Sequence, residues 1–155
     1  SIAGIGSFEQ GLYQNIDDLS NCKLYTDKTY DLINVADLAI VTSGTATLEC
    51  ALIGTAQIVV YKTSFLNYII AKLLVRIKFI SLVNLILDRE LVNEFIQFNS
   101  KVNKLNIQMK DLLTNVERRR VISEGYSEIK KILTDRKASD NAALEIVSLI
   151  KLSRP

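Results

Sequence analysis

Apolar segments of strand length alternate with segments of helical period between Ile2 and Tyr61. The strand-like segments are Ile2 to Ile5, Cys22 to Tyr25, Leu38 to Thr42 and Gln57 to Tyr61. The helical segments between them are Phe8 to Asn15, Lys28 to Val35 and Ala46 to Ile53. Strands that alternate with helices in this way form a parallel sheet with right-handed crossovers. The pattern therefore predicts an open α/β sheet with flanking helices.

After Tyr61 the pattern predicts only helices, which form an all-helical tail. Their expected bounds are Phe65 to Ile77, Glu90 to Gln97, Asn103 to Asn115, Glu117 to Leu133 and Ser139 to Leu152. Ser139 or Asp140 is the expected N-cap of the last helix. We expect residues 1–115 to form the α/β domain and residues 116–155 to form a helical tail that packs on this domain or on a partner.

The turn after the third strand carries the sharpest chemical signal. Ser43, Gly44 and Thr45 supply hydroxyls and backbone N–H groups at a helix N-terminus, and Gly44 lets a ligand approach the backbone. This pattern favours a diphosphate or nucleotide site. Glu49 lies one turn into the helix, where a carboxylate can accept two hydrogen bonds from a ribose diol. The alternative is plain N-capping by Ser43 or Thr45, with Glu49 complementing the helix dipole.

A second polar cluster surrounds Leu91-Val92. Its members are Asn84, Asp88, Arg89, Glu90 and Glu94. One interpretation is that Asn84 and Glu94 bind sugar hydroxyls. The alternative is a capped helix, with Asp88 as its N-cap and Glu90 near its N-terminus.

The segment from Phe65 to Leu87 is apolar, with Lys72, Arg76 and Lys78 on or near one face. One interpretation is a surface that contacts anionic lipid while its apolar face is partly inserted. The alternative is a core helix whose long cations reach solvent. The run from Ile77 to Leu87 is too short and too polar to span a bilayer.

Composition narrows the classes of function. The chain has 155 residues, is 48% hydrophobic, and carries a net charge of +2, so one domain is expected and nothing global favours nucleic acid. The charge run from Glu117 to Arg120 lacks aromatic interleaving and indicates a solvated or ion-paired face rather than an RNA patch. The absence of histidine excludes a His-based triad and most zinc sites within the chain. Cys22 and Cys50 are expected to be buried thiols in a reducing compartment.

Four segments, in this order and spacing, together resemble one known family. They are TYDLINVADLAIVTSGTATLECALIGTAQIVVYKTS (Thr29 to Ser64), ISLVNLILDRELVNEFIQ (Ile80 to Gln97), EGYSEIKKIL (Glu124 to Leu133) and KASDNAALEIVSLI (Lys137 to Ile150). Nearly the whole chain resembles the carboxyl-terminal half of lipid-A-disaccharide synthase, a GT-B glycosyltransferase. SGTATLE recurs loosely in other GT-B enzymes, whereas the Ile80 to Gln97 segment is more specific to the synthase.

The resemblance implies two Rossmann-like domains that face a cleft. It implies that UDP-2,3-diacylglucosamine is joined to lipid X through a β-1,6 linkage, with release of UDP and without an obligatory metal or other cofactor. It also implies a peripheral protein on the cytoplasmic face of the inner membrane of a Gram-negative bacterium. Some members of the family exchange carboxyl-terminal helices in a homodimer, so the resemblance also implies a homodimer as an expected partner.

Carried onto this sequence, the resemblance assigns Ser43, Gly44 and Thr45 to the donor diphosphate and Glu49 to the uridine ribose, with Thr47 as a close neighbour. The resemblance also places a second group of residues near the cleft, but it assigns no individual role to any of them. These residues are Asn84, Arg89, Glu90 and Gln97.

The chain starts at Ser1 without Met and within a strand pattern, so we expect it to be a fragment of a longer protein. The resemblance implies that the catalytic base belongs to an amino-terminal domain that is not part of this fragment. We therefore expect this chain alone to be catalytically inert. Two other interpretations stay open. One is a GT-B or epimerase domain that acts on a soluble UDP-sugar, and the other is a noncatalytic helical interaction module.

Overall fold

The computed structural model describes residues 1–6, 21–62, 78–96, 102–135 and 138–152. The helices expected at Phe8 to Asn15 and Phe65 to Ile77 lie outside these residues, as does most of the apolar and basic segment. Within the described part of the chain, every helix is too short or too polar to cross a bilayer.

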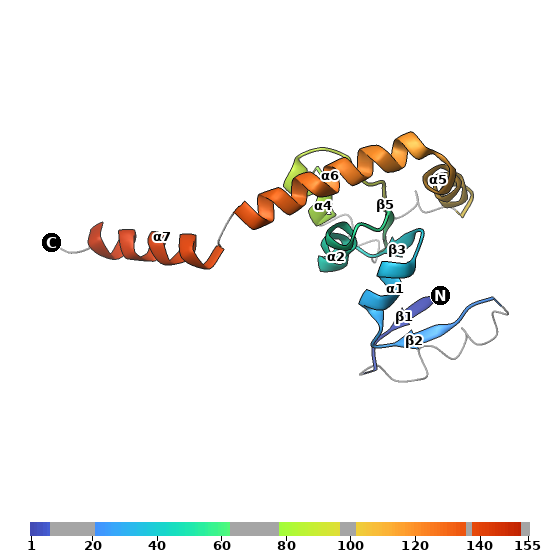
Figure 1. Ribbon diagram of the computed structural model, residues 1–155, viewed down its shortest axis with the longest axis horizontal. Helices are drawn as coiled ribbons and strands as arrows, with labels where there is room; N and C mark the ends of the chain where they lie inside the picture. Colours follow the sequence, from blue (N-terminus) through green and yellow to red (C-terminus); the bar gives the residue numbers. More distant parts are fainter. Residues whose placement is uncertain (7–20, 63–77, 97–101, 136–137, 153–155) are drawn as a thin grey trace.

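All strands of the described residues pair in parallel, in two separate sheets. Strand β1 (Ile2–Gly4) pairs with β2 (Leu24–Thr26), and the second sheet has the order β3-β4-β5 (Ala39–Val41, Gln57–Tyr61, Glu94–Ile96). Helix α1 (Thr29–Val35) lies between the two sheets (Figure 1). The expected α/β class with parallel strands is confirmed, although the strands do not form one continuous sheet.

Strand β5 corrects the prediction that only helices follow Tyr61. The segment Glu90 to Gln97 was expected to be helical, but Glu94–Ile96 forms a strand whose residues pair with Val59, Val60 and Tyr61 of β4. A strand of three residues carries little periodicity of its own, and its conformation is set by pairing with the edge of β4. Nonlocal pairing therefore overrides the local helical pattern.

Helices α2 (Thr45–Ile53), α4 (Leu82–Leu87) and α6 (Val116–Asp135) pack against one another over the β3-β4-β5 sheet (Figure 1). Helix α5 (Val102–Thr114) packs on α6. The apolar core lies between these elements and comprises Ala51, Ile58, Val59, Val83, Leu91, Val92, Leu112, Ile122, Tyr126 and Ile129. Each of these side chains is almost fully removed from water, so burial of apolar area is the main stabilising contribution.

The two faces of α6 have different chemistry. Ile122, Tyr126 and Ile129 recur at helical spacing and form its buried stripe. On the exposed face, Arg120 pairs with Glu117 at 2.6 Å and with Glu124, as expected for a solvated charge run.

Helix α7 (Ala138–Leu152) lies beyond the end of α6, away from the sheets (Figure 1). It begins at Ala138, so Ser139 and Asp140 lie within its first turn rather than at the expected N-cap position. Several of its apolar side chains are exposed, among them Leu144 and Leu149.

Candidate functional site

The predicted turn lies at the carboxyl edge of the β3-β4-β5 sheet. Strand β3 ends at Val41, and Gly44 is the N-cap of α2. Gly44 has φ 141° and ψ −159°, a backbone region that is essentially restricted to glycine. A Cβ placed on Gly44 would meet no atom within 4 Å, so the space beside this backbone is open. The turn therefore exposes main chain where the sequence predicts a ligand.

The first turn of α2 has no side-chain cap. Ser43 Oγ donates to Ile80 O at 2.6 Å instead of accepting from the helix, and Thr45 is exposed. The alternative interpretation, in which Ser43 or Thr45 caps the helix, is therefore wrong. The Thr47 N–H donates to Gly44 O at 3.3 Å, and the N–H groups of Thr45 and Ala46 stay available. They lie at the positive end of the helix dipole, which is the arrangement that binds phosphate groups.

Thr47 holds the turn in place from the buried side of α2. Its Oγ1 donates to Gly44 O at 2.8 Å and accepts from Leu82 N at 3.3 Å, and the residue is fully buried. These contacts join the turn to the start of α4. Thr47 therefore supports the exposed residues of the turn rather than facing solvent itself.

Glu49 follows Thr45 by four residues, so the two side chains lie on the same face of α2. Glu49 is half-buried and makes no hydrogen bond or ion pair with another described residue. The pKa of the neighbouring Cys50 thiol is raised to about 11, first by burial and second by the charge of Glu49. The position of Glu49 is consistent with a ribose contact, which remains a prediction.

Glu94 organises the second polar cluster. One of its carboxylate oxygens accepts from Ile80 N at 2.8 Å, while the other accepts from Ser81 N at 2.9 Å, Ser81 Oγ at 2.7 Å and Asn84 Nδ2 at 2.8 Å. Ser81 in turn caps α4 by accepting from Asn84 N at 3.3 Å. The carboxylate therefore fixes the segment that meets Ser43 and Thr47 beside the turn.

Asn84 is fully buried, and both ends of its amide are engaged. Its Oδ1 accepts from Leu91 N at 2.8 Å and Val92 N at 3.0 Å, and its Nδ2 donates to Val92 O at 2.8 Å as well as to Glu94. These contacts hold the loop between α4 and β5. A sugar contact by Asn84 remains a prediction, and its observed bonds are internal.

Arg89 and Glu90 lie beyond the other end of α4 from the turn. Asp88 ends α4 in a left-handed conformation, with φ 48°, so the alternative in which Asp88 begins a helix is wrong. Arg89 pairs with Glu128 of α6 at 2.5 Å, which raises the pKa of the guanidinium and lowers that of the carboxyl. Glu90 accepts a long bond of 3.4 Å from Asn93 Nδ2. The structure thus brings residues 43–49 and Asn84 into one region, but it separates Arg89 and Glu90 from the turn.

Gln97 lies outside the described residues, so its predicted place near the cleft is not located. Glu94 and Ser81 were not predicted as supports of the turn. The signal for Ser81 is a serine directly before the apolar segment LVNLIL, which is typical of an N-cap. The role of Glu94 has no comparable local signal, because its partners are ten to fourteen residues away.

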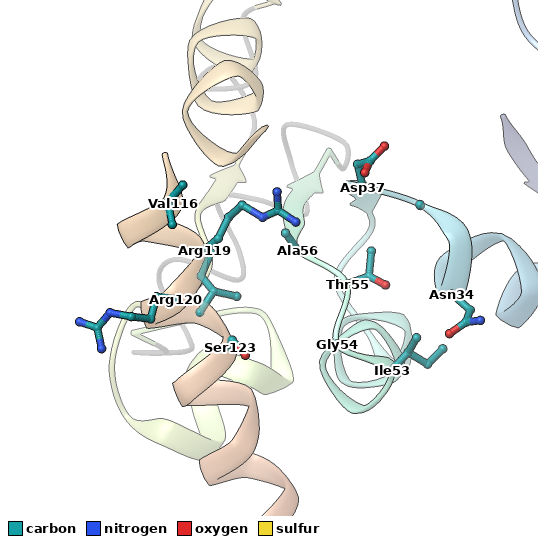
Figure 2. Close-up of a pocket in the computed structure, with 12 residues that line it drawn as sticks. Asn34, Asp37, Ile53, Gly54, Thr55, Ala56, Val116, Arg119, Arg120 and Ser123 are labelled. Carbon is teal, nitrogen blue, oxygen red and sulfur yellow. The ribbon is translucent and has the colours of Figure 1, made fainter. Parts of the chain in front are cut away.

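A cavity of about 500 Å³ lies at the opposite, amino-terminal edge of β3 and β4 (Figure 2). Both Arg119 and Arg120 of α6 line this cavity; Arg119 extends toward Ala56, whereas the guanidinium of Arg120 points away from Ala56. Here α2 presents its C-terminal end, and the N–H groups of Gly54 and Thr55 both donate to Cys50 O. This edge therefore lacks free N–H donors from α2 and carries the negative end of its dipole, whereas the carboxyl edge offers the positive end of the same helix.

Parallel strands, crossover helices and an open turn at the carboxyl edge define an α/β domain of the ligand-binding type. The sequence model of the family described as Lipid-A-disaccharide synthetase matches residues 6–148, and the chain belongs to this family.

Curated relatives agree with this assignment. Lipid-A-disaccharide synthase of Syntrophus aciditrophicus is 37% identical over 88% of this chain and 36% of its own length. The synthase of Rickettsia prowazekii is 46% identical over 64% of this chain and 25% of its own length. The synthase of Rickettsia conorii is 38% identical over 76% of this chain and 26% of its own length. The chain therefore spans about a quarter to a third of these relatives.

Proposed function

We propose that this chain is the donor-binding part of a lipid-A-disaccharide synthase and that the first turn of α2 holds the diphosphate of the UDP-sugar. The observation that carries the proposal is the uncapped N-terminus of α2 behind Gly44, at the carboxyl edge of a parallel sheet. The family supplies the reaction class, because its members are named lipid-A-disaccharide synthases.

The residues of the site then have distinct roles. The N–H groups that follow Gly44 bind diphosphate oxygens, with the hydroxyls of Ser43 and Thr45 beside them. Glu49 accepts hydrogen bonds from the uridine ribose. Thr47 and Asn84 hold the backbone around the site. Arg89, Glu90 and Gln97 stay assigned to the wider cleft without individual roles.

The proposed reaction transfers the diacylglucosamine of the donor to the 6-hydroxyl of lipid X with inversion, releasing UDP. Charge accumulates on the diphosphate as the glycosidic bond breaks, and positioned donors at a helix N-terminus stabilise that charge. The base that removes the acceptor proton is assigned to an amino-terminal GT-B domain. The 155-residue chain alone should therefore bind UDP without turning over substrate.

The proposed setting follows from the substrates. Both carry acyl chains, so we assign the enzyme to the cytoplasmic surface of the inner membrane, where Phe65 to Lys78 would contact anionic lipid. Partners are then the donor, the lipid acceptor, the amino-terminal domain and, in a homodimer, a second copy.

Calorimetric titration of the chain with UDP tests the proposal, with uridine and 2′-deoxy-UDP as comparison ligands. UDP should bind more tightly than uridine because of its diphosphate. Glu49→Gln should weaken UDP binding by about tenfold, which is the loss of one charged hydrogen bond. Its effect on 2′-deoxy-UDP should be smaller, because only the 3′-hydroxyl of that ligand can still meet the side chain at position 49.

Glu145→Gln is the matched control, because it removes the same charge from an exposed position on α7. It should leave UDP affinity unchanged. Equal affinity of the chain for UDP and uridine would contradict the diphosphate site. An equal effect of Glu49→Gln on UDP and on 2′-deoxy-UDP would contradict the ribose contact.

A further inference from the structure

A buried glutamine connects helix α6 to the first turn of α2. Gln57 Nε2 donates to Thr47 O at 2.8 Å and to Tyr126 OH at 3.0 Å. Gln57 and Thr47 are fully buried, and Tyr126 is 2% exposed. Burial raises the pKa of the Tyr126 phenol, so its oxygen stays neutral and accepts the bond. Three elements, α6, β4 and α2, are therefore joined by one polar side chain.

The connection continues to the open turn. Thr47, whose carbonyl accepts from Gln57, donates through its hydroxyl to Gly44 O at 2.8 Å. Gly44 is the residue whose backbone faces the open space. A line of hydrogen bonds thus runs from Tyr126 through Gln57 and Thr47 to Gly44, and each of its side chains is held in a low-dielectric interior where such bonds are strong.

Fold stability alone does not account for a glutamine at this position. Gln57 Oε1 is buried and has no hydrogen-bond partner among the described residues. An orphaned buried acceptor opposes folding, and apolar side chains of the same shape can replace such polar groups with little loss of stability. Gln57 lies at the start of β4 beside core residues such as Ile58, where an apolar side chain would be ordinary.

We propose that Gln57 and Tyr126 are positioning residues that fix the first turn of α2 for the donor diphosphate. This inference rests on the proposed function of that turn. The amide of Gln57 locks the Thr47 carbonyl, and Thr47 locks Gly44, so the N–H groups that follow Gly44 are oriented before the ligand arrives. Such preorganisation raises affinity by reducing the ordering that binding requires.

The double variant Gln57→Met/Tyr126→Phe tests the proposal in the full 155-residue chain. It removes the amide, the hydroxyl and the orphaned oxygen together while keeping the side-chain shapes. The thermal midpoint should stay close to that of the original chain or rise, because no buried polar group is left unpaired by the change. UDP affinity should fall by about 3- to 10-fold, which is the range for the loss of one net hydrogen bond.

Ile129→Val is the control for packing in α6. Ile129 is fully buried in the core and makes no side-chain hydrogen bond, so this variant should lower the thermal midpoint and leave UDP affinity unchanged. Opposite responses of stability and affinity in the two variants would support a positioning role. A purely structural role predicts that affinity follows stability in both.

Three results would overturn the inference, and the first two are distinguishable from failure of the proposed function. If the original chain binds UDP and Gly44→Ala weakens binding, but the double variant binds UDP as tightly as the original chain, only the positioning role fails. If the double variant loses affinity only as far as its thermal midpoint falls, the positioning role also fails. If the original chain binds UDP no more tightly than uridine, the proposed function fails and the inference fails with it.

Discussion

The two glycines that flank α2 allow a matched test of the site. Gly44 has φ 141° at the N-terminus of the helix, and Gly54 has φ 108° at its C-terminus. A Cβ at either position would meet no atom within 4 Å, so substitution by alanine introduces backbone strain without a steric clash. The two variants therefore change the same helix by the same chemistry at opposite ends.

Alanine strains the observed backbone at both positions, and strain of this kind amounts to about 1–3 kcal/mol. For a chain of this length the thermal midpoint should fall by roughly 2–4 °C for each kcal/mol, in both variants. Only Gly44→Ala should weaken UDP binding, because relief of the strain rotates the Gly44 carbonyl and the N–H groups that follow it. Loss of one or two charged hydrogen bonds to the diphosphate predicts about 10- to 100-fold weaker binding.

Calorimetric titration with UDP and thermal unfolding of the three chains provide the assay. Unchanged UDP affinity in Gly44→Ala, despite a lowered thermal midpoint, would refute the assignment of the turn. An equal loss of affinity in Gly54→Ala would show that general stability of α2, rather than the geometry of its first turn, controls binding.

Three further predictions concern the support of the site. Between pH 9 and pH 11 the unfolded chain ionises the Cys50 thiol, whose ordinary pKa is 9.0, while the folded chain, with a pKa of about 11, keeps its proton. Stability should therefore fall as the pH rises through this range. Cys50→Ala should remove up to roughly 3 kcal/mol of this fall in the free energy of unfolding. Urea unfolding at pH 9 and at pH 11 measures the fall in both chains. If stability falls equally with pH in the two chains, the raised pKa of Cys50 is contradicted. Glu94→Gln should lower the free energy of unfolding by about 1–3 kcal/mol, because an amide nitrogen cannot accept the bonds from Ser81 or Ile80. Urea unfolding at neutral pH measures this loss, and a stability equal to that of the original chain would contradict the network. Arg89→Ala should shift the thermal midpoint by less than about 2 °C, because its pair with Glu128 is half exposed and screened by salt. A larger shift that persists at high salt would indicate a stronger structural role.

The sequence predicts the unit from β3 through α2 to β4 well, because each part has a local cause. The strands are short apolar runs, and Gly54 ends the helix between them. The open turn at Ser43 and Gly44 follows from the same pattern. The absence of a side-chain cap on α2 is not predictable, because Ser43 donates instead to the carbonyl of Ile80, 37 residues later in the chain.

The parts that the sequence does not predict depend on distant partners. Strand β5 exists because Glu94–Ile96 pairs with β4, and Glu94 folds back on the segment before α4. The side-chain hydrogen bonds of Asn84 link α4 to the loop before β5, so the Asn84 amide is engaged within the fold. Gln57 does leave a weak signal, since it is a lone polar residue at the start of the buried segment IVV, but its partner Tyr126 is 69 residues away.

We claim that the first turn of α2 binds the diphosphate of a uridine nucleotide, and backbone amide NMR of the isotopically labelled chain locates the bound nucleotide residue by residue. Titration with UDP should shift the amide resonances of Gly44, Thr45 and Ala46 most strongly, while uridine at the same concentration should leave them nearly unchanged. Shifts centred instead on Gly54 to Ala56, at the opposite edge of the sheet, would contradict the claim.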